Sequence, residues 1–456
     1  MTLWNRLVFL LICTIVMFTT LAYGTVHQPI IAVTYILVSL LMIVWAVDGF
    51  ASGKLQFSRS LLQLPLLLLA IYAFIQTIPF GTYAEAAGVT GIPRTISVEP
   101  FATEVTALHM LFLAAFFMIV LASIDSAARL KKFVAVLTIF GFIYAFYAIL
   151  QSVLSPDKIY GIYKPQSATP FGSFVNRHDF AAIIELLIAL PLGMLFSGSL
   201  RPDKRLIYVV AAALMGTALL LSGSRGGLVA LVAEVLLIVI LTTRLRGTKD
   251  LVLKAGLSIL MLLAAVGGAI FVGGDTSLTR FATGAASDDI TSNRSQIWSV
   301  TVKVIGEHMP FGAGLGAFTQ AYAKLDTSSG FERVDQAHND YLQMLADAGI
   351  IGLVIGGLFL FWFFREGRRN VRIDNKFRRG VAVGAFAGCF GILVHSAFDF
   401  VLHITAVSVM FIAVMSILVA TGRKYHDDIT DHDDESSKRR RRKANVTPIS
   451  TLEKVQ

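Results

Sequence analysis

Residues 336–364, QAHNDYLQMLADAGIIGLVIGGLFLFWFF, begin as a polar segment and continue as an apolar run. A membrane-spanning helix needs about 20 mostly apolar residues to cross the hydrocarbon core. The run 345–364 meets that requirement and therefore predicts a membrane helix. His338, Asn339 and Asp340 then stand at the membrane boundary, so their role depends on the side of the membrane that they face.

The same apolar pattern recurs along the whole chain of 456 residues, of which 55% are hydrophobic and only 15% are charged. Soluble domains average about 25% charged residues. We therefore predict an all-α, polytopic membrane protein with about twelve transmembrane helices. The predicted spans lie near 7–24, 29–47, 60–80, 104–123, 133–153, 178–197, 205–222, 226–243, 255–273, 345–364, 380–398 and 402–421.

The distribution of basic residues predicts the orientation. If the N-terminus is cytoplasmic, most of the 39 Lys and Arg fall in cytoplasmic segments, above all in 365–379 and in the C-terminal tail. Such an excess is typical of the cytoplasmic side, so we predict N-in and C-in. The net charge of +9 then reflects topology and not nucleic-acid binding. Cys13 and Cys389 lie in apolar runs and give no disulfide framework.

The sequence divides into a membrane domain, residues 1–421, and a charged tail, residues 422–456. The largest external loop is predicted at about 274–340, and its stretch NRSQIWSVTVKVIGEH is expected to be helical. Trp298, Val302 and Ile305 recur there at helical spacing, which favours contact with the bilayer surface or with the bundle. The tail contains an acidic block followed by RRRR, and we expect it to be disordered and attracted to anionic lipids.

Two stripes follow the helical repeat at the start of span 345–364. They consist of His338, Leu342, Leu345, Gly349 and Gly352, and of the polar residues Asp340, Gln343 and Asp347. His338 thus stands at the N-terminus of an amphipathic helix end. The alternative is that the His-Asn-Asp sequence only caps the helix. Both can hold, because a capped helix end is a rigid support for a catalytic imidazole.

A second candidate is the stretch LLLSGSRGGLVALVAEV, residues 219–235, in which Arg225 lies in a short external hairpin between two spans. Gly223, Gly226 and Gly227 allow the backbone to turn and leave the guanidinium approachable. Arginine holds phosphate oxygens through a fork of N–H donors. We interpret Arg225 as a phosphate-binding residue supported by Ser222. The alternative is an arginine that reaches to lipid headgroups.

Two more external segments carry candidate binding residues. Arg294 lies in DDITSNRSQIW on the long loop, where an unpaired arginine is otherwise a solvated charge. Asn176, Arg177 and His178 lie in FGSFVNRHDF, at the external end of the sixth span. These three residues face the substrate in our interpretation, and a helix cap is the alternative.

Three other patterns give weaker indications of a functional site. His395, Asp399 and His403 are spaced four apart, but a structural zinc site usually needs a fourth ligand that the sequence does not provide. The glycines of FGAGLGAF do not follow a strand in a βαβ unit, so they do not indicate dinucleotide binding. Glu185 and Glu234 lie within apolar spans, where ionisable groups are costly and commonly functional, although a structural pair is the alternative.

Taken in order, SGSRGG, SNRSQIW…PFGAGLGAF and HNDYLQMLADAGIIG resemble segments of the O-antigen ligase and polymerase superfamily, which are bacterial polytopic glycosyltransferases. FGSFVNRHDFA and HSAFDF are similar to segments that recur in such proteins. The resemblance covers roughly residues 165–420. It implies a bacterial inner-membrane enzyme whose active site faces the periplasm, which makes the external loop about 274–340 periplasmic.

The resemblance also implies roles for particular residues. An undecaprenyl-diphosphate-linked glycan would be the donor, His338 the general base or acceptor-positioning residue, and Arg225 and Arg294 the diphosphate ligands. Two guanidiniums can take over the role of a metal ion, so we expect no metal and no cofactor. A single displacement opposite the diphosphate would invert the anomeric carbon. Arg280 and Arg333 are rivals for the position of Arg294. The supporting residues are Asn339, Asn176, Arg177, His178 and Ser222.

Several functions remain open at this level. We favour transfer of a glycan to lipid A core, as in a ligase, and a growing glycan as acceptor, as in a polymerase, uses the same donor chemistry. A lipid-linked glycan flippase or secondary transporter fits the number of spans but normally shows paired repeats. A membrane scaffold leaves Arg225 and His338 unexplained. Bilayer lipids are expected partners, nucleic acid is not, and no protein partner is indicated.

Overall fold

The computed structural model describes residues 2–83, 88–166, 168–243, 294–327 and 333–425, with isolated positions between 252 and 259. Every regular element in these ranges is a helix. The helices are α1 (Leu3–Leu21), η1 (Tyr23–Thr25), α2 (Gln28–Ser52), η2 (Leu61–Gln63), α3 (Leu64–Gln76), α4 (Pro100–Ser123), α5 (Ala127–Leu154), α6 (Arg177–Phe196), α7 (Pro202–Ser222), α8 (Arg225–Thr242), α10 (Arg294–His308), α11 (Phe318–Leu325), α12 (Asp340–Asn370), α13 (Lys376–His395), η3 (Val401–His403) and α14 (Thr405–Thr421).

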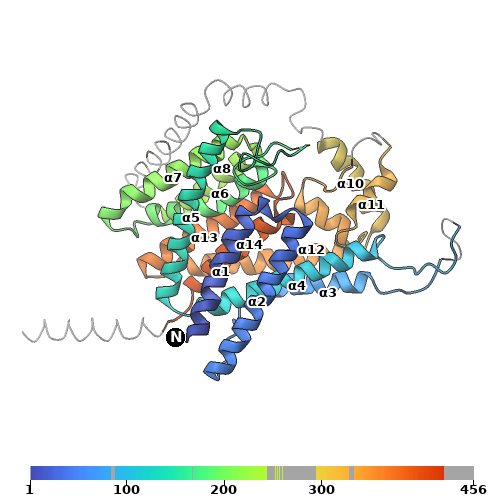
Figure 1. Cartoon of the computed structure of the whole chain (residues 1–456), viewed down its shortest axis with the longest axis horizontal. Helices are drawn as coiled ribbons and strands as arrows, with labels where there is room; N and C mark the ends of the chain where they lie inside the picture. Colours follow the sequence, from blue (N-terminus) through green and yellow to red (C-terminus); the bar gives the residue numbers. More distant parts are fainter. Residues whose placement is uncertain are drawn as a thin grey trace, which may run out of the picture.

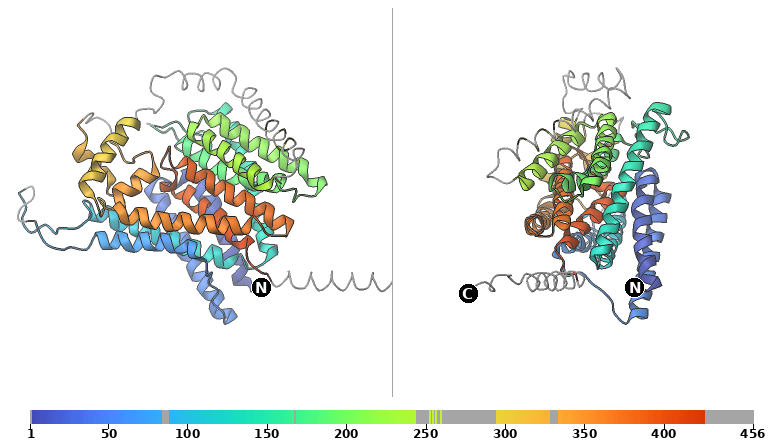
Figure 2. Two further views of the ribbon diagram at one scale, coloured as in Figure 1. Left: turned by 180° about the vertical axis from the view of Figure 1, so that it is seen from behind. Right: turned by 90° about the vertical axis from the view of Figure 1, so that its left-hand side faces the viewer.

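The bundle is built around α6, α13 and α14. Nearly all residues of α6 and α14 are buried, and most of their side chains are apolar. A helix that is apolar all round belongs in the interior of a bundle. Helices α7 and α8 lie on one side of this centre, and α3 and α4 lie on the opposite side (Figures 1 and 2). The outer helices expose large apolar side chains such as Ile36, Ile139, Leu206 and Ile240.

Most predicted spans coincide with a helix of the structure. Within the described residues, nine helices are long and apolar enough to cross a membrane, and two apolar helices, Leu61–Gln76 and Thr405–Thr421, are shorter. The predicted span 255–273 lies outside the described residues. The fold class is therefore confirmed as an all-helical, multi-pass membrane protein, whereas the count of twelve stays a prediction.

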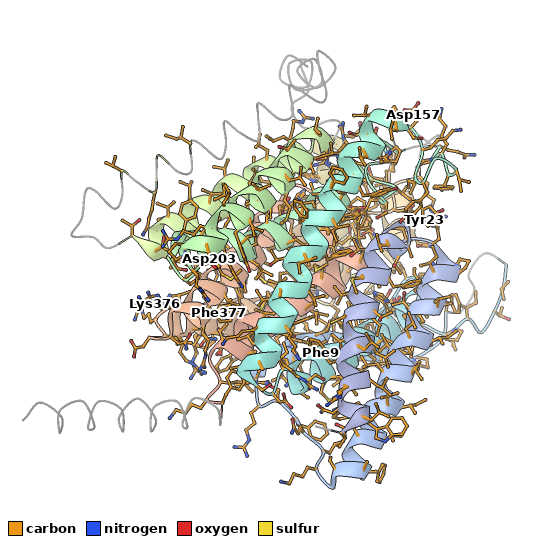
Figure 3. All side chains as sticks on the ribbon, turned by 60° about the vertical axis from the view of Figure 1, so that its left-hand side comes forward. Phe9, Tyr23, Asp157, Asp203, Lys376 and Phe377 are labelled. Atoms are coloured by element: carbon orange, nitrogen blue, oxygen red, sulfur yellow. The ribbon has the colours of Figure 1, made fainter. Side chains whose placement is uncertain are left out.

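The helix ends fall into two groups that match the predicted loops. Tyr23 and Asp157, from predicted external segments, lie on one side of the bundle, and Asp203, Lys376 and Phe377 lie on the other (Figure 3). The end that we predict to be cytoplasmic is held together by arginine contacts with backbone carbonyls. Arg423 donates to Ile124 O at 3.0 Å and Arg378 donates to Thr421 O at 2.8 Å. This arrangement is compatible with an N-in, C-in topology.

Arg423 and Tyr425 also bear on the predicted domain boundary at residue 422. Tyr425 is buried and donates a hydrogen bond to Ala420 O at 2.7 Å, so the first residues of the predicted tail contact the membrane domain. The rest of the tail, residues 426–456, lies outside the described residues. Its disorder and its attraction to lipids stay predictions.

Helix α12 is interrupted at Gly349, which has φ 57° and ψ −146°. The predicted stripe from His338 to Gly352 is therefore wrong as a continuous helical face, because the chain changes direction at Gly349. Pro310 O accepts a hydrogen bond from the Ile350 amide at 2.9 Å across this break. A Cβ at Gly349 would lie 2.1 Å from the same oxygen, so only glycine fits.

The FGAGLGAF segment packs against this break in α12. Gly312, Gly314 and Gly316 all have positive φ, and Gly314 N donates to Asp347 O at 3.0 Å. Gln76 of α3 donates to Asp347 O and to Phe311 O at 2.9 and 3.0 Å, which ties the segment to the bundle. These glycines therefore serve close backbone packing.

Helices α10 and α11 form a small unit at one end of the bundle (Figure 1). Its core contains Val300, Val304 and Phe318. Trp298 donates its indole N–H to Ala337 O at 3.0 Å, so it contacts the segment before α12. Val302 is 58% exposed. The predicted helix over NRSQIWSVTVKVIGEH is present as α10. Of the predicted stripe, Trp298 and Ile305 contact the protein and Val302 is exposed, while the inward positions Val300 and Val304 were not predicted.

Candidate functional site

His338 lies immediately before α12, in the left-handed region of backbone space with φ 49°. This conformation is uncommon for a residue with a side chain and often marks a functional site. Asn339 is the N-cap of α12, because its Oδ1 accepts hydrogen bonds from the amides of Tyr341 and Leu342, each at 3.0 Å. Asn339 therefore caps the helix, as the alternative interpretation predicts. The His338 side chain is not used for capping and can contact other groups.

Asp399 joins two of the predicted site residues. Its Oδ1 lies 3.1 Å from His338 Nδ1, and its Oδ2 accepts a hydrogen bond from Arg294 at 3.0 Å. Arg294 also donates to Phe398 O. The Asp399 side chain is 3% exposed, whereas that of His338 is 31% exposed. The carboxylate thus orients an imidazole and a guanidinium that come from different helices.

The segment after α13 is bonded to the start of α12 at several points. Asn339 Nδ2 donates to Ala397 O at 2.9 Å, and the amide of Asp340 donates to Ser396 O at 2.8 Å. Asp340 Oδ1 also lies 2.7 Å from His403 Nδ1. These contacts hold the loop that carries Asp399 against the residues that carry His338.

Helix α8 begins at the same end of the bundle. Ser224 is its N-cap and accepts a hydrogen bond from the Gly227 amide at 3.1 Å. His178 Nδ1 lies 2.9 Å from the Ser224 hydroxyl, which links the starts of α6 and α8. Arg225 is the first residue of α8 and is exposed. A Cβ at Gly226 would lie 3.5 Å from Phe398 Cβ, which places this turn beside the Asp399 loop.

The FGSFVNRHDF segment supplies the start of α6. Asn176 is the N-cap, because its Oδ1 accepts from the His178 amide at 3.0 Å. A guanidinium nitrogen of Arg177 lies 3.5 Å from the position of a Cβ on Gly223, at the α7–α8 turn. The structure therefore brings Arg177 and His178 to the arginine hairpin. Asn176 serves mainly as a cap.

The site combines an ionised carboxylate with several positively charged groups. Burial raises the pKa of Asp399, but the hydrogen bond with His338 and the charge of Arg294 outweigh burial and hold this pKa below its usual range. Asp399 is thus ionised at neutral pH.

The helices α6, α8, α10 and α12 all begin at this site, and helix N-termini carry partial positive charge. Together with Arg177, Arg225 and Arg294, they form a site suited to phosphate groups.

Ser222 supports the arginine hairpin from the inside. It is fully buried, donates its hydroxyl hydrogen to Leu219 O at 2.6 Å and accepts a hydrogen bond from the Ser224 amide at 3.3 Å, whereas Ser224 is the serine that contacts His178. Arg333 pairs with Asp335 at 2.6 Å on the exposed surface. Arg280 lies outside the described residues. Of the two described rivals, Arg294 and Arg333, Arg294 is the one that shares Asp399 with His338.

The zinc alternative fails on geometry. Helix α13 ends at His395, so His395, Asp399 and His403 do not share one helical face. His395 pairs with Glu185, Asp399 with His338, and His403 with Asp340. In the described part of the chain no group of three or more His, Cys, Asp or Glu is arranged to hold a metal ion.

Sequence reasoning missed two members of the site. Asp399 entered only as part of the zinc pattern, and Ser224 was passed over in favour of Ser222. The available signal for Asp399 was an acidic residue at the external end of a span, in HSAFDF, one of the segments that carried the resemblance. The signal for Ser224 was its position directly before the helix that starts at Arg225, which is where N-cap serines lie.

The fold and the site define a polytopic membrane protein with a cluster of polar and charged side chains at one end of its helical bundle. Residues 210–356 match the family model described as O-antigen ligase, and no curated protein matches the chain. This match confirms the predicted resemblance to the O-antigen ligase superfamily, and it includes Arg225, Arg294 and His338. It implies glycan transfer of the ligase or polymerase kind, on lipid-linked glycans, in a multi-pass bacterial inner-membrane protein.

Proposed function

We propose that the protein transfers a glycan from an undecaprenyl-diphosphate-linked donor to an acceptor hydroxyl at the periplasmic face of the inner membrane, with lipid A core as the acceptor. The observation that carries this proposal is the contact of Asp399 with both His338 and Arg294. It unites a group that can take up a proton with a group that can hold a phosphate. The Arg225 hairpin lies beside them.

In the proposed reaction, the acceptor oxygen attacks the anomeric carbon of the donor sugar and the bond from that carbon to the diphosphate breaks. The electron pair of the broken bond goes to the diphosphate oxygen. Arg225 and Arg294 stabilise the negative charge that develops there, supported by the partial charges of the helix N-termini. A single displacement of this kind inverts the configuration at the anomeric carbon.

His338 accepts the proton of the acceptor hydroxyl. Ionised Asp399 accepts the Nδ1 hydrogen, which leaves Nε2 of His338 as the basic nitrogen. Imidazole is the side chain best suited to take up and release protons near neutral pH. A positioned base of this type commonly contributes about 10²–10⁴-fold to the rate. Asp399 thereby holds the imidazole in the required tautomer, as a carboxylate does in other catalytic pairs.

The experiment uses the purified full-length protein, an undecaprenyl-diphosphate-linked oligosaccharide and a metal chelator. One reaction contains lipid A core and a second contains only further donor. We expect glycan-modified lipid A core in the first reaction, with undecaprenyl diphosphate released and the chelator without effect. A ladder of longer lipid-linked glycans in the second reaction would assign the polymerase function in its place. Folded protein that gives neither product with several donor glycans would overturn the proposal.

A further inference from the structure

A buried ion pair lies directly beneath the arginine hairpin. His395 Nδ1, at the end of α13, lies 2.9 Å from Glu185 Oε1 of α6 and 3.3 Å from Oε2. Both side chains are fully buried. Ionisable groups inside a membrane bundle are costly, and those that are present commonly serve a function. Neither residue is needed to bind the donor or to move a proton in the reaction proposed above.

The first turn of α8 rests on this pair. A Cβ at Gly226 would lie 2.9 Å from His395 Nε2, and a Cβ at Gly227 would lie 2.9 Å from Glu185 Oε1. Real Cβ atoms essentially never approach so closely, so only glycine at both positions allows the turn to sit here. The glycines of SGSRGG therefore have different roles. Gly223 forms the turn with φ 67°, whereas Gly226 and Gly227 lack a Cβ and so leave room for the side chains of His395 and Glu185.

The pair also touches the other half of the site. His395 is the last residue of α13, and its carbonyl oxygen accepts a hydrogen bond from the Asp399 amide at 3.0 Å. Asp399 in turn holds His338 and Arg294. His395 is thus a single residue whose side chain supports the turn of Arg225 and whose backbone supports the loop of Asp399.

We infer that Glu185 and His395 are positioning residues, which fix the Arg225 turn relative to Arg294 and His338 so that two guanidiniums can hold one diphosphate. The inference rests on the proposed function, because it assumes that both arginines bind the donor. A buried ion pair contributes little net stability compared with apolar packing, so a contribution to stability alone does not account for this pair. A displacement of about 1 Å at a binding group can cost about 100-fold in rate.

The test compares three purified full-length variants. Glu185→Ala removes the partner of His395, Glu185→Gln keeps a side chain of the same shape, and Glu234→Gln is the matched control. Glu234 is also fully buried, and it lies on α8 itself, more than two turns beyond Gly226. The measurements are the Kd of undecaprenyl diphosphate, the donor and acceptor KM, kcat, and the apparent Tm in detergent.

For Glu185→Ala we expect the Kd of undecaprenyl diphosphate and the donor KM to rise about tenfold or more, with the acceptor KM unchanged. For Glu185→Gln we expect the Kd of undecaprenyl diphosphate and the donor KM to lie within about threefold of wild type, because the side chain can still accept a hydrogen bond from His395. Glu234→Gln should match wild type. If Glu185→Ala does not fold, Gly226→Ala takes its place, since its Cβ displaces the turn from His395, and the same rise is expected.

Wild-type affinity and wild-type donor KM in Glu185→Ala would overturn the inference. So would an equal rise in donor and acceptor KM together with a lower Tm, because that pattern indicates general destabilisation. The proposed function fails differently, since wild-type protein itself would then neither bind undecaprenyl diphosphate nor transfer a glycan.

Discussion

At the scale of single residues, Asp399 uses both of its carboxylate oxygens, one for His338 and one for Arg294. Asp399→Asn keeps the shape but removes the charge and replaces one acceptor oxygen by a donor. We expect the transfer rate to fall about 100-fold or more, because the imidazole loses the acceptor that selects its tautomer. Initial rates at saturating donor measure this loss. Asp335→Asn, on the exposed partner of Arg333, is the control and should retain the wild-type rate.

The depressed pKa of Asp399 also predicts a pH dependence. An Asp with a folded-state pKa below its unfolded value of about 3.9 contributes stability that is complete above that pH and is lost as the pH falls through the folded pKa. The difference in apparent Tm between wild type and Asp399→Asn should therefore be constant from pH 8 to 5. It should shrink only below about pH 4. A difference that already shrinks between pH 8 and 6 would show that Asp399 is not held ionised.

At the scale of elements, the break in α12 fixes the direction in which the start of this helix presents His338. Gly349→Ala places a Cβ 2.1 Å from Pro310 O on a residue with φ 57°. We expect destabilisation of about 2 kcal/mol or more from backbone strain and overpacking, with a lower transfer rate. Gly356→Ala lies in the same helix with open space around its Cβ, and it should be neutral or slightly stabilising. Thermal unfolding in detergent compares the two variants.

The sequence predicted the elements better than their contacts. Long apolar runs predict membrane helices because the bilayer sets both length and composition, and so the span 345–364 lies within α12. The break at Gly349 was missed because it depends on Pro310, which is remote in the sequence. Asp399 was missed as the partner of His338 for the same reason, since 61 positions separate them. Arg225 and His338 were predicted as candidates because each stands at a polar helix start beside an apolar run.

At the scale of the whole molecule, the proposal requires the end with α10 and α11 to face the periplasm. Cys13 and Cys389 are both buried, so a single introduced cysteine reports the accessibility of its own position. Lys324→Cys, on exposed α11, should react with a membrane-impermeant maleimide in intact spheroplasts. Lys376→Cys, on the opposite side of the bundle (Figure 3), should react only after the membrane is opened. The reverse pattern would contradict the orientation.

In the proposed reaction His338 is the base of the glycan transfer. The most direct measurement is the rate of glycan transfer from an undecaprenyl-diphosphate-linked donor by purified His338→Ala, beside His308→Ala as control. His308 lies at the end of α10, with its ring nitrogen 2.9 Å from Val304 O and not at Asp399.

We predict that His338→Ala loses transfer by about 10²-fold or more while it still binds undecaprenyl diphosphate with wild-type affinity. His308→Ala should transfer at the wild-type rate. Transfer by folded His338→Ala at the rate of His308→Ala would contradict the account.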